Sequence, residues 1–310
     1  MKVYNFISSY KFHDPVVTIG TFDGVHRGHV QLLNRLCEIS GKLGTESVVI
    51  TLWPHPQMVL RPEDNSFKLL NTLNEKLAQF ENACVNNLII VPFTKEIAKM
   101  SSEEFIKNIL VERIKAKHLL VGYDNQIGRN REGDINQFKE LGKRFGFEVD
   151  QFDQVIVGEQ KISSTVIRRN IEQGNIENAN LLLGYPYSLT GIVVEGNKLG
   201  RTIGFPTANL QIGESYKLLP KDGVYAVLIQ MNGLKYKGML NIGLRPTVNS
   251  NELKRTIETH IFNFDDNLYK HEITISFVHR IRDEIKFNNF EELTIQLNKD
   301  RDLIQKLLLN

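Results

Sequence analysis

The chain has 310 residues, of which 41% are hydrophobic and 24% are charged, and its formal net charge is +2 at pH 7. This composition is that of an ordinary globular protein and excludes a disordered or low-complexity chain. The length predicts two domains, at roughly 150 residues each. Since the net charge is small, any positive surface that binds an anion must be local.

No run approaches the roughly 20 apolar residues of a membrane-spanning helix, and we expect no signal peptide because the first residues lack basic and apolar regions. The two cysteines, Cys37 and Cys84, are too few for a disulfide framework or a metal cluster. Cys37 falls in a predicted helix and is expected to be a core thiol. A reducing cytoplasm is the expected compartment.

The first half of the chain alternates short apolar runs with segments of helical spacing. The runs that predict buried strands are 16–19, 47–52, 87–91 and 118–122. Helices are predicted over 30–36 and 73–80, and a third begins after Ser101, which forms a capping box with Glu104. The alternation predicts a parallel sheet with helices on both faces, and ligands bind such sheets at the carboxyl ends of strands.

The most informative stretch is the glycine-punctuated turn 20–29 between the first strand and the first helix, because it contains His26 and His29. Such a turn directs backbone N–H groups and the positive end of the helix dipole at one point, which suits a phosphate. Two imidazoles three residues apart share one face of a helical turn and can grip the same phosphate chain. No Gly-Lys-Ser/Thr follows, so this is not a Walker A loop. The alternative is two solvent-facing histidines at an ordinary helix start.

The pattern changes near residue 185, where a helix ending at 181–184 leads into a linker. Short runs of period two then follow, at 188–194, 223–229, 235–242, 256–262 and 271–278. Asn232-Gly233 is a hairpin signal, and the series predicts an antiparallel barrel or sandwich. The last segment, 290–308, predicts an amphipathic closing helix whose charges form a solvated face. Its apolar stripe comprises Phe290, Leu293, Leu297, Ile304 and Leu308.

The turn 20–29 resembles the HxGH signature of the nucleotidyltransferase superfamily. The chain as a whole resembles the bacterial bifunctional riboflavin kinase/FAD synthetase family. The further motifs that carry this resemblance are 54–56, 121–124 and 162–168 in the first half, and 200–209, 223–225, 241–247 and 258–261 in the second. The resemblance implies an α/β, Rossmann-like adenylyltransferase domain over 1–184 and a mainly β riboflavin kinase domain over 185–310. The latter is expected to be a six-stranded antiparallel barrel with a closing helix.

For the first domain the resemblance implies transfer of AMP from ATP to FMN, with release of pyrophosphate. The FMN phosphate is already an anion, so positioning and charge neutralisation suffice. The expected catalytic residues are His26, His29 and Arg168, and the expected phosphate-binding residues are Gly20, Phe22, Asp23, Gly24, Gly28, Ser163, Ser164 and Thr165. Two alternatives stay open: Asp23 either holds the turn or orients a magnesium ion, and the hydroxyls of 163–165 either bind phosphate or only cap a helix.

His55 and Asp124 are the flavin-binding candidates of the first domain, and His55 is expected to shape its loop between two prolines. The chain departs from the family pattern after Asp124, where an aromatic or histidine, a basic residue and Phe-Gly are usual. Here the sequence is Asn-Gln-Ile-Gly over 125–128. Loss of an aromatic ring weakens flavin stacking. The narrower alternative is therefore a riboflavin kinase with a weakened adenylyltransferase site.

For the second domain the resemblance implies phosphorylation of a riboflavin hydroxyl, which benefits from a general base. Glu258 matches the family's catalytic glutamate, although without the family match it is an ordinary exposed strand carboxylate. Thr207 and Asn209 point the same way on an extended backbone and carry hard oxygens suited to Mg²⁺, or they form a plain turn and cap. The remaining candidates are Gly200, Arg201, Gly204 and Pro206 around the ATP phosphates, and Arg245 near flavin or phosphate.

The expected partners are the small molecules riboflavin, FMN and ATP, with no nucleic acid and no membrane, and the oligomeric state is left open. A different class remains: a small barrel in a chain of pI about 8.4 can bind single-stranded RNA. Basic and aromatic residues do not interleave on the predicted strands, which disfavours that alternative.

Overall fold

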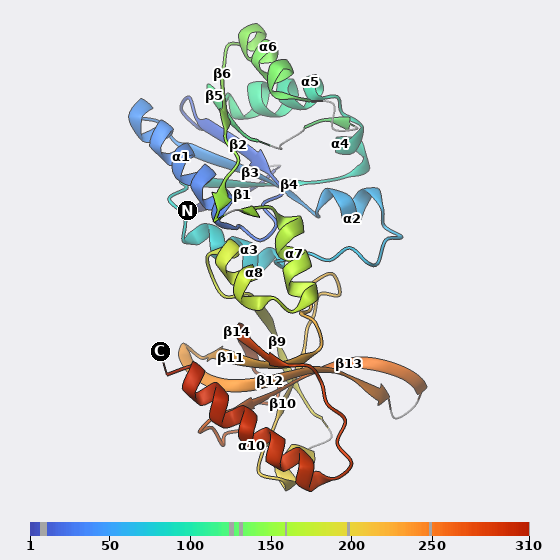
Figure 1. Ribbon diagram of the computed structural model, residues 1–310. Coiled ribbons are helices and arrows are strands. Elements are labelled where there is room, and N and C mark those ends of the chain that lie inside the picture. Colours follow the sequence, from blue (N-terminus) through green and yellow to red (C-terminus); the bar gives the residue numbers. More distant parts are fainter. Residues whose placement is uncertain are drawn as a thin grey trace. The chain divides into compact units, whose positions relative to one another are not determined.

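The computed structural model describes residues 1–6, 11–123, 127–129, 133–158, 160–196, 199–247 and 250–309 (Figure 1). The chain divides into two compact units, Met1–Ser164 and Thr165–Asn310. This division falls 20 residues before the domain boundary expected from the sequence (184 − 164 = 20), because two helices pack with the second unit. Residues 124–126, with the flavin candidate Asp124, lie outside the described residues.

The first unit is built on a six-stranded sheet whose strand pairs are all parallel. In sheet order the strands are β1 (Lys2–Asn5), β4 (Asn87–Pro92), β3 (Ser47–Trp53), β2 (Val16–Gly20), β5 (His118–Gly122) and β6 (Glu148–Phe152). The four strands predicted from apolar runs are confirmed. Since both faces of a parallel sheet are covered, its strands read as continuous apolar runs rather than as alternating ones.

Helices cover both faces of this sheet, as predicted (Figure 1). α1 (Arg27–Leu43) and α3 (Leu73–Glu81) pack on one face, while the π-helix η1 (Ile106–Ile114) and α6 (Ile135–Phe145) pack on the other. The remaining elements are α2 (Pro56–Leu60), α4 (Lys95–Lys99), α5 (Ser102–Phe105), β7 (Ile156–Val157), β8 (Gln160–Lys161) and the start of α7 (Ser164–Gln173). The predicted capping box of Ser101 and Glu104 is present at α5.

The order of strands reverses between β2 and β5. The chain proceeds outward from β2 to β3 and β4 on one side, and from β5 to β6 on the other. In open α/β sheets the ligand site lies at such a switch point, outside the carboxyl ends of the strands. The turn that follows β2 and contains the two histidines therefore occupies the position where this fold binds ligands.

The second unit is a closed antiparallel barrel of six strands, as the sequence resemblance implied (Figure 1). Around the barrel the order is β10 (Ala208–Gln211), β13 (Ser250–Ile261), β12 (Leu234–Thr247), β11 (Gly223–Met231), β14 (Glu272–Arg282) and β9 (Ser188–Val194). The other elements are the rest of α7, α8 (Ile176–Leu183), α9 (Leu199–Thr202) and α10 (Phe290–Leu307). Asn232 and Gly233 both have positive φ, of 49° and 78°, which is the hairpin turn predicted between β11 and β12.

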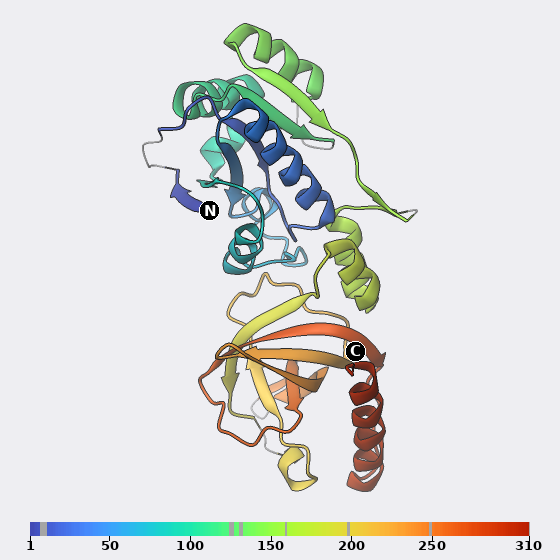
Figure 2. The same cartoon turned by 90° about the vertical axis from the view of Figure 1, so that its left-hand side faces the viewer.

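The closing helix α10 packs beside the barrel (Figure 2), but its charges do not all face solvent as predicted. Asp300 is 2% exposed, and it accepts hydrogen bonds from Nε and Nη2 of Arg282 on β14 at 3.0 and 2.7 Å. The prediction was wrong because the charge pattern of one helix does not reveal a partner on a distant strand. Ile304 is fully buried, whereas Phe290 is 59% exposed at the other end of the predicted stripe.

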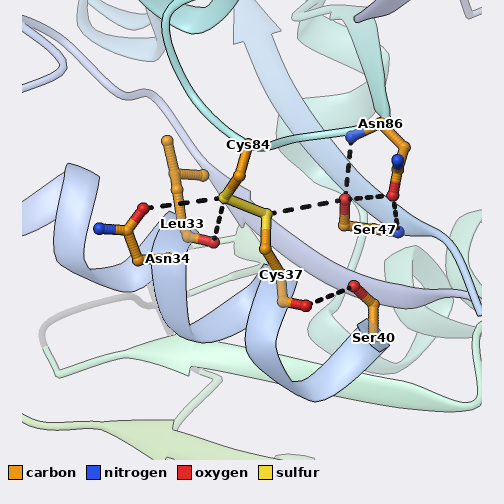
Figure 3. Close-up of a disulfide and its surroundings, with 7 residues drawn as sticks. All are labelled: Leu33, Asn34, Cys37, Ser40, Ser47, Cys84 and Asn86. Atoms are coloured by element: carbon orange, nitrogen blue, oxygen red, sulfur yellow. Dashed lines mark hydrogen bonds between the residues drawn. A yellow bond between two sulfur atoms is a disulfide. The ribbon is translucent and has the colours of Figure 1, made fainter. Parts of the chain in front are cut away.

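The expectation of an unpaired core thiol at Cys37 is also wrong, since Cys37 and Cys84 form a disulfide (Figure 3). Cys37 lies on α1, and Cys84 lies in the loop between α3 and β4, 47 residues later. Cys84 is exposed, and its sulfur also lies 3.6 Å from the carbonyl oxygen of Leu33. The pairing was missed because sequence separation carries no information on whether two segments pack together.

Candidate active sites

The turn between β2 and α1 has a constrained backbone. Phe22, Gly24 and Val25 all have positive φ, of 48°, 85° and 33°. Positive φ is costly for residues other than glycine and persists only where the surroundings enforce it. The conformation brings the chain sharply from the carboxyl end of β2 into the first turn of α1, whose N-cap is His26.

His26 and His29 face each other across the start of α1. Their rings stack with centroids 3.6 Å apart and planes 13° apart, and Nδ1 of His26 accepts a hydrogen bond from the backbone N–H of His29 at 3.3 Å. A Cβ atom on Gly28 would lie 3.2 Å from Nδ1 of His26. The glycine of the HxGH pattern thus leaves the space in which the first histidine caps the helix.

Burial keeps both imidazoles neutral near pH 7. It lowers the pKa of His26 to about 4, against a smaller opposing effect of the Asp23 carboxylate. Burial also lowers the pKa of His29 well below its usual value, helped by His26 and Lys76. Nδ1 of His29 is buried without a hydrogen-bond partner among the described residues. The pair therefore offers neutral hydrogen-bonding groups to a phosphate rather than two positive charges.

Asp23 fixes this turn through hydrogen bonds to two other segments of the chain. Its carboxylate is buried and accepts hydrogen bonds from the backbone N–H groups of Leu70 at 2.9 Å and Asn71 at 3.4 Å. Its own carbonyl oxygen accepts a hydrogen bond from Oγ of Ser164 at 2.8 Å, across 141 residues of sequence. These contacts favour the turn-holding role of Asp23 over a magnesium role, and they join the 163–165 motif to the histidine turn.

The other predicted residues of this region lie as follows. His55 is the N-cap of α2, where its Nδ1 accepts a hydrogen bond from the backbone N–H of Gln57 at 3.2 Å. Gly20 ends β2, and Ser163 directly precedes α7. Thr165 is exposed, and Arg168 follows one turn later on α7, in the second unit.

A cavity of about 1180 Å³ in the second unit is lined by barrel strands and by residues of α10, among them Phe290, Leu293 and Leu297. The strand register of the barrel places six residues in a row across neighbouring strands, each paired with the next. In order they are Val194, Asn209, Glu258, Asn241, Val224 and Arg282. All six line the cavity. Residues directly opposite on antiparallel strands are close neighbours on one face, so Glu258 lies between two asparagines that come from β10 and β12.

The segment 200–207 forms part of the cavity wall. Gly200 and Thr207 line the cavity, whereas Arg201, Gly204 and Pro206 are not among the lining residues. A Cβ atom on Gly200 would lie 2.1 Å from the carbonyl oxygen of Phe205, so no other residue fits there. The segment is fixed to β13 by a hydrogen bond of 2.8 Å, in which Nδ1 of His260 donates to the carbonyl oxygen of Pro206.

Arg245 lies between two carboxylates at the cavity wall. Its Nε is 3.9 Å from Oε1 of Glu258, and its Nη1 is 3.2 Å from Oε1 of Glu284. Glu284 also accepts a hydrogen bond from Nδ2 of Asn241 at 3.0 Å, and a Cβ atom on Gly243 would lie 1.9 Å from its Oε1. Arg245 is therefore close enough to Glu258 to influence its environment, and it lines the cavity.

Sequence reasoning missed Asn241 as a neighbour of Glu258, Glu284 as a partner of Arg245, and Lys76 beneath the histidine turn. Asn241 lies within the motif 241–247, and the alternation of β12 could have placed its side chain on the same face as Met239, opposite the buried Leu240 and Ile242. Glu284 and Lys76 carry no local signal, because each is brought to its site by packing between distant segments.

A stacked histidine pair at the switch point of a parallel sheet is the arrangement of an α/β nucleotidyltransferase, and the second unit is a barrel with a carboxylate, Glu258, on the wall of the cavity that α10 helps to line. Family models described as FAD synthetase and riboflavin kinase match residues 9–166 and 183–308. The chain belongs to the bifunctional riboflavin kinase/FMN adenylyltransferase family.

Proteins named bifunctional riboflavin kinase/FMN adenylyltransferase resemble the chain over nearly its whole length. One from Listeria monocytogenes is 39% identical over 92% of this chain and 90% of its own. One from Buchnera aphidicola is 37% identical over 94% and 93%. A solved structure from Streptococcus pneumoniae, described as a macrolide-efflux protein, has a TM-score of 0.90 at 30% identity and covers 98% of this chain and 99% of its own. In the described part of the chain, no helix has the length and apolar character needed to cross a membrane.

Proposed function

We propose that the chain phosphorylates riboflavin to FMN in its barrel and adenylates FMN to FAD in its α/β unit, with one ATP consumed at each step. The observation that carries the proposal is the combination, in one chain, of the stacked histidine turn and the Asn209–Glu258–Asn241 row. Matches to both family models favour this over the kinase-only alternative. We propose a cytoplasmic location and the functional division 1–184 and 185–310.

In the kinase reaction, a ribityl hydroxyl oxygen attacks the γ-phosphorus of ATP and the bond to ADP breaks. Glu258 is proposed to take the hydroxyl proton, a role that requires a carboxylate within the cavity. Asn209 and Asn241, opposite Glu258 on either side, would orient the hydroxyl and the phosphates by hydrogen bonds. Arg245 carries a positive charge near the carboxylate and is proposed to balance it when the substrate arrives.

Mg²⁺ is proposed to accompany ATP in the barrel. Thr207 and Asn209 line the cavity and offer the hydroxyl and amide oxygens that would hold it. Among the described residues, no three His, Cys, Asp or Glu side chains come together as a metal site. A Mg²⁺ ion that accompanies ATP takes few protein ligands and completes its coordination shell with water and phosphate. When bound, the ion neutralises phosphate charge.

In the adenylyltransferase reaction, an FMN phosphate oxygen attacks the α-phosphorus of ATP and pyrophosphate leaves. The nucleophile needs no base, so the site must position two anions and offset their repulsion. His26 and His29 are proposed to hydrogen-bond the phosphates, with the first N–H groups of α1 and the helix dipole behind them. Gly20, Phe22, Gly24 and the 163–165 hydroxyls complete the proposed phosphate site, and Arg168 is proposed to supply charge.

The test is chromatographic separation of flavins after the purified chain is incubated with riboflavin, ATP and Mg²⁺. We expect FMN to appear first and FAD to follow. FMN without FAD at saturating ATP would support the kinase-only alternative. Unchanged riboflavin, together with unchanged FMN in a second incubation, would refute the enzymatic proposal.

A further inference from the structure

Lys76 is a buried cation directly beneath the histidine turn. It lies in the first turn of α3 and is 1% exposed. Its Nζ donates a hydrogen bond of 2.8 Å to the carbonyl oxygen of Thr21 and lies 4.9 Å from the centroid of the Trp53 ring. A lysine almost never loses all solvent contact without a compensating interaction, so this burial requires an explanation.

Lys76 interacts electrostatically with Asp23, which anchors the histidine turn, and with His29. Burial lowers the pKa of Lys76 to about 8, while the Asp23 carboxylate opposes that shift. Lys76 in turn helps to lower the pKa of His29, and Asp23 acts on His26 in the opposite direction. Lys76 is therefore electrostatically coupled to His29 and to Asp23, the residue that anchors the turn.

The backbone contact of Lys76 falls on the peptide that opens the turn. The Thr21 carbonyl oxygen accepts a hydrogen bond from Nζ of Lys76, and it also lies 3.4 Å from Oγ1 of Thr51. In a trans peptide the C=O and N–H groups point in opposite directions, so the N–H of Phe22 faces away from Lys76. A cation on the carbonyl side polarises the peptide and makes that N–H a better donor, and the hydrogen bond fixes the peptide that precedes Phe22, whose φ is positive.

With the proposed function as its premise, we infer that Lys76 is a positioning residue for adenylyl transfer, whose buried positive charge holds and polarises the turn that receives the phosphates of ATP. It does not touch the reacting atoms; it acts through the Thr21–Phe22 peptide and through the field at His29. Nothing in the local sequence signals this role, since Lys76 reads as an ordinary helical lysine.

Lys76→Met tests whether the positive charge of Lys76 matters, because methionine keeps nearly the same side-chain length and removes the ammonium group. We expect kcat/KM for FMN adenylation to fall roughly tenfold or more, while riboflavin phosphorylation by the same chain stays within about twofold. Lys42→Met is the matched control, because Lys42 lies on α1 with its side chain 69% exposed, and it should leave both activities unchanged.

The pH profile of the unaltered chain provides a readout that packing alone would not move. Lys76 is charged below its pKa, so kcat/KM for FMN adenylation should fall as pH rises through about 8. His26 and His29 are already neutral there because burial lowers their pKa values. Among the residues that the structure describes, Asp23 is the charged group that acts on Lys76. The alkaline fall should be absent from Lys76→Met.

The outcomes separate this inference from the proposed function. If the unaltered chain makes no FAD from FMN and ATP, the proposed function fails at its first step. If it makes FAD and Lys76→Met does so at a similar rate, the role of Lys76 is refuted. Should Lys76→Met lose the kinase activity as well, the unaltered chain decides: a flat profile from about pH 7 to 9.5 contradicts the inference, and a fall near pH 8 supports it.

Discussion

Replacement of Asp300 by Asn tests how the closing helix is held to the barrel. Asp300 is the buried member of the pair with Arg282, and their side chains are 3% and 16% exposed. Its carboxylate accepts hydrogen bonds from Nε and Nη2 of Arg282. It also accepts one from Nε2 of Gln296, at 2.8 Å. Asn removes the negative charge with almost no change in volume, so the effect measured is that of the ion pair.

The expected magnitude follows from the geometry. Two charge-assisted hydrogen bonds contribute about 1.5–3 kcal/mol each, and breaking a buried pair, which leaves the other charge uncompensated, costs about 3–5 kcal/mol. Since Arg282 retains some solvent contact, we expect a loss of about 3 kcal/mol in the free energy of unfolding of the second unit. For a unit of this size that corresponds to a fall in Tm of roughly 10 °C.

Calorimetry with the full chain measures this effect, together with the loss of riboflavin kinase activity after brief heating. The only tryptophan, Trp53, lies in the first unit, so its fluorescence transition serves as an internal control and should not move. Asp302→Asn is the matched variant, because Asp302 is on the same helix and pairs with Arg301 at the surface. We expect it to change stability by less than about 0.5 kcal/mol.

A loss below about 1 kcal/mol for Asp300→Asn would refute the reasoning, since it would mean that the pair contributes no more than an exposed one. A further check is Asp300→Leu combined with Arg282→Met. A well-packed apolar pair is often as stable as a buried ion pair, so this double variant should be more stable than Asp300→Leu alone.

Three further predictions concern other parts of the chain. Cys84→Ser should lower the free energy of unfolding by about 4 kcal/mol, from the 47-residue separation of Cys37 and Cys84, and dithiothreitol should reproduce this in the unaltered chain but not in the variant. Gly200→Ala forces a Cβ atom to within 2.1 Å of a backbone carbonyl, so kinase activity should fall roughly tenfold or more, whereas Gly213→Ala, with open space around it, should be neutral. The pKa of His26 is about 4 in the folded chain and 6.5 in the unfolded chain, so between these pH values the unfolded chain binds one proton more. The free energy of unfolding, measured with urea, should therefore fall by about 3 kcal/mol as the pH drops from 6.5 to 4. A constant urea midpoint over this range would contradict the prediction.

The fold was predictable to a large extent because its signals are local. Apolar runs marked β2, β3, β4 and β5, and glycine at 233 marked the hairpin of the barrel. β10 was not predicted as a strand, because it has only four residues and this is too short to show an alternation of apolar and polar side chains. The strand order that creates the switch point depends on pairing between distant segments, which periodicity does not report.

The sites were predictable in composition but not in arrangement. His26 and His29 are near neighbours in sequence, so their common face could be inferred, but their neutrality comes from burial by the rest of the unit. Glu258 and Asn209 were both named, yet their direct opposition depends on the register of β10 and β13. Lys76 belongs to the histidine turn only because α3 packs against it, and this contact spans 55 residues.

The central claim is that one chain has two separate catalytic sites, and the most direct test is the product pattern of two variants given each substrate in turn. Glu258→Gln should leave riboflavin unphosphorylated but still convert FMN to FAD, whereas His29→Asn should convert riboflavin to FMN and stop there. Glu272→Gln, an exposed carboxylate on the same barrel, and His13→Asn, an exposed histidine of the first unit, serve as controls and should match the unaltered chain. If either site variant lost both conversions while folded, or lost neither, the assignment of the two reactions to these two sites would be wrong.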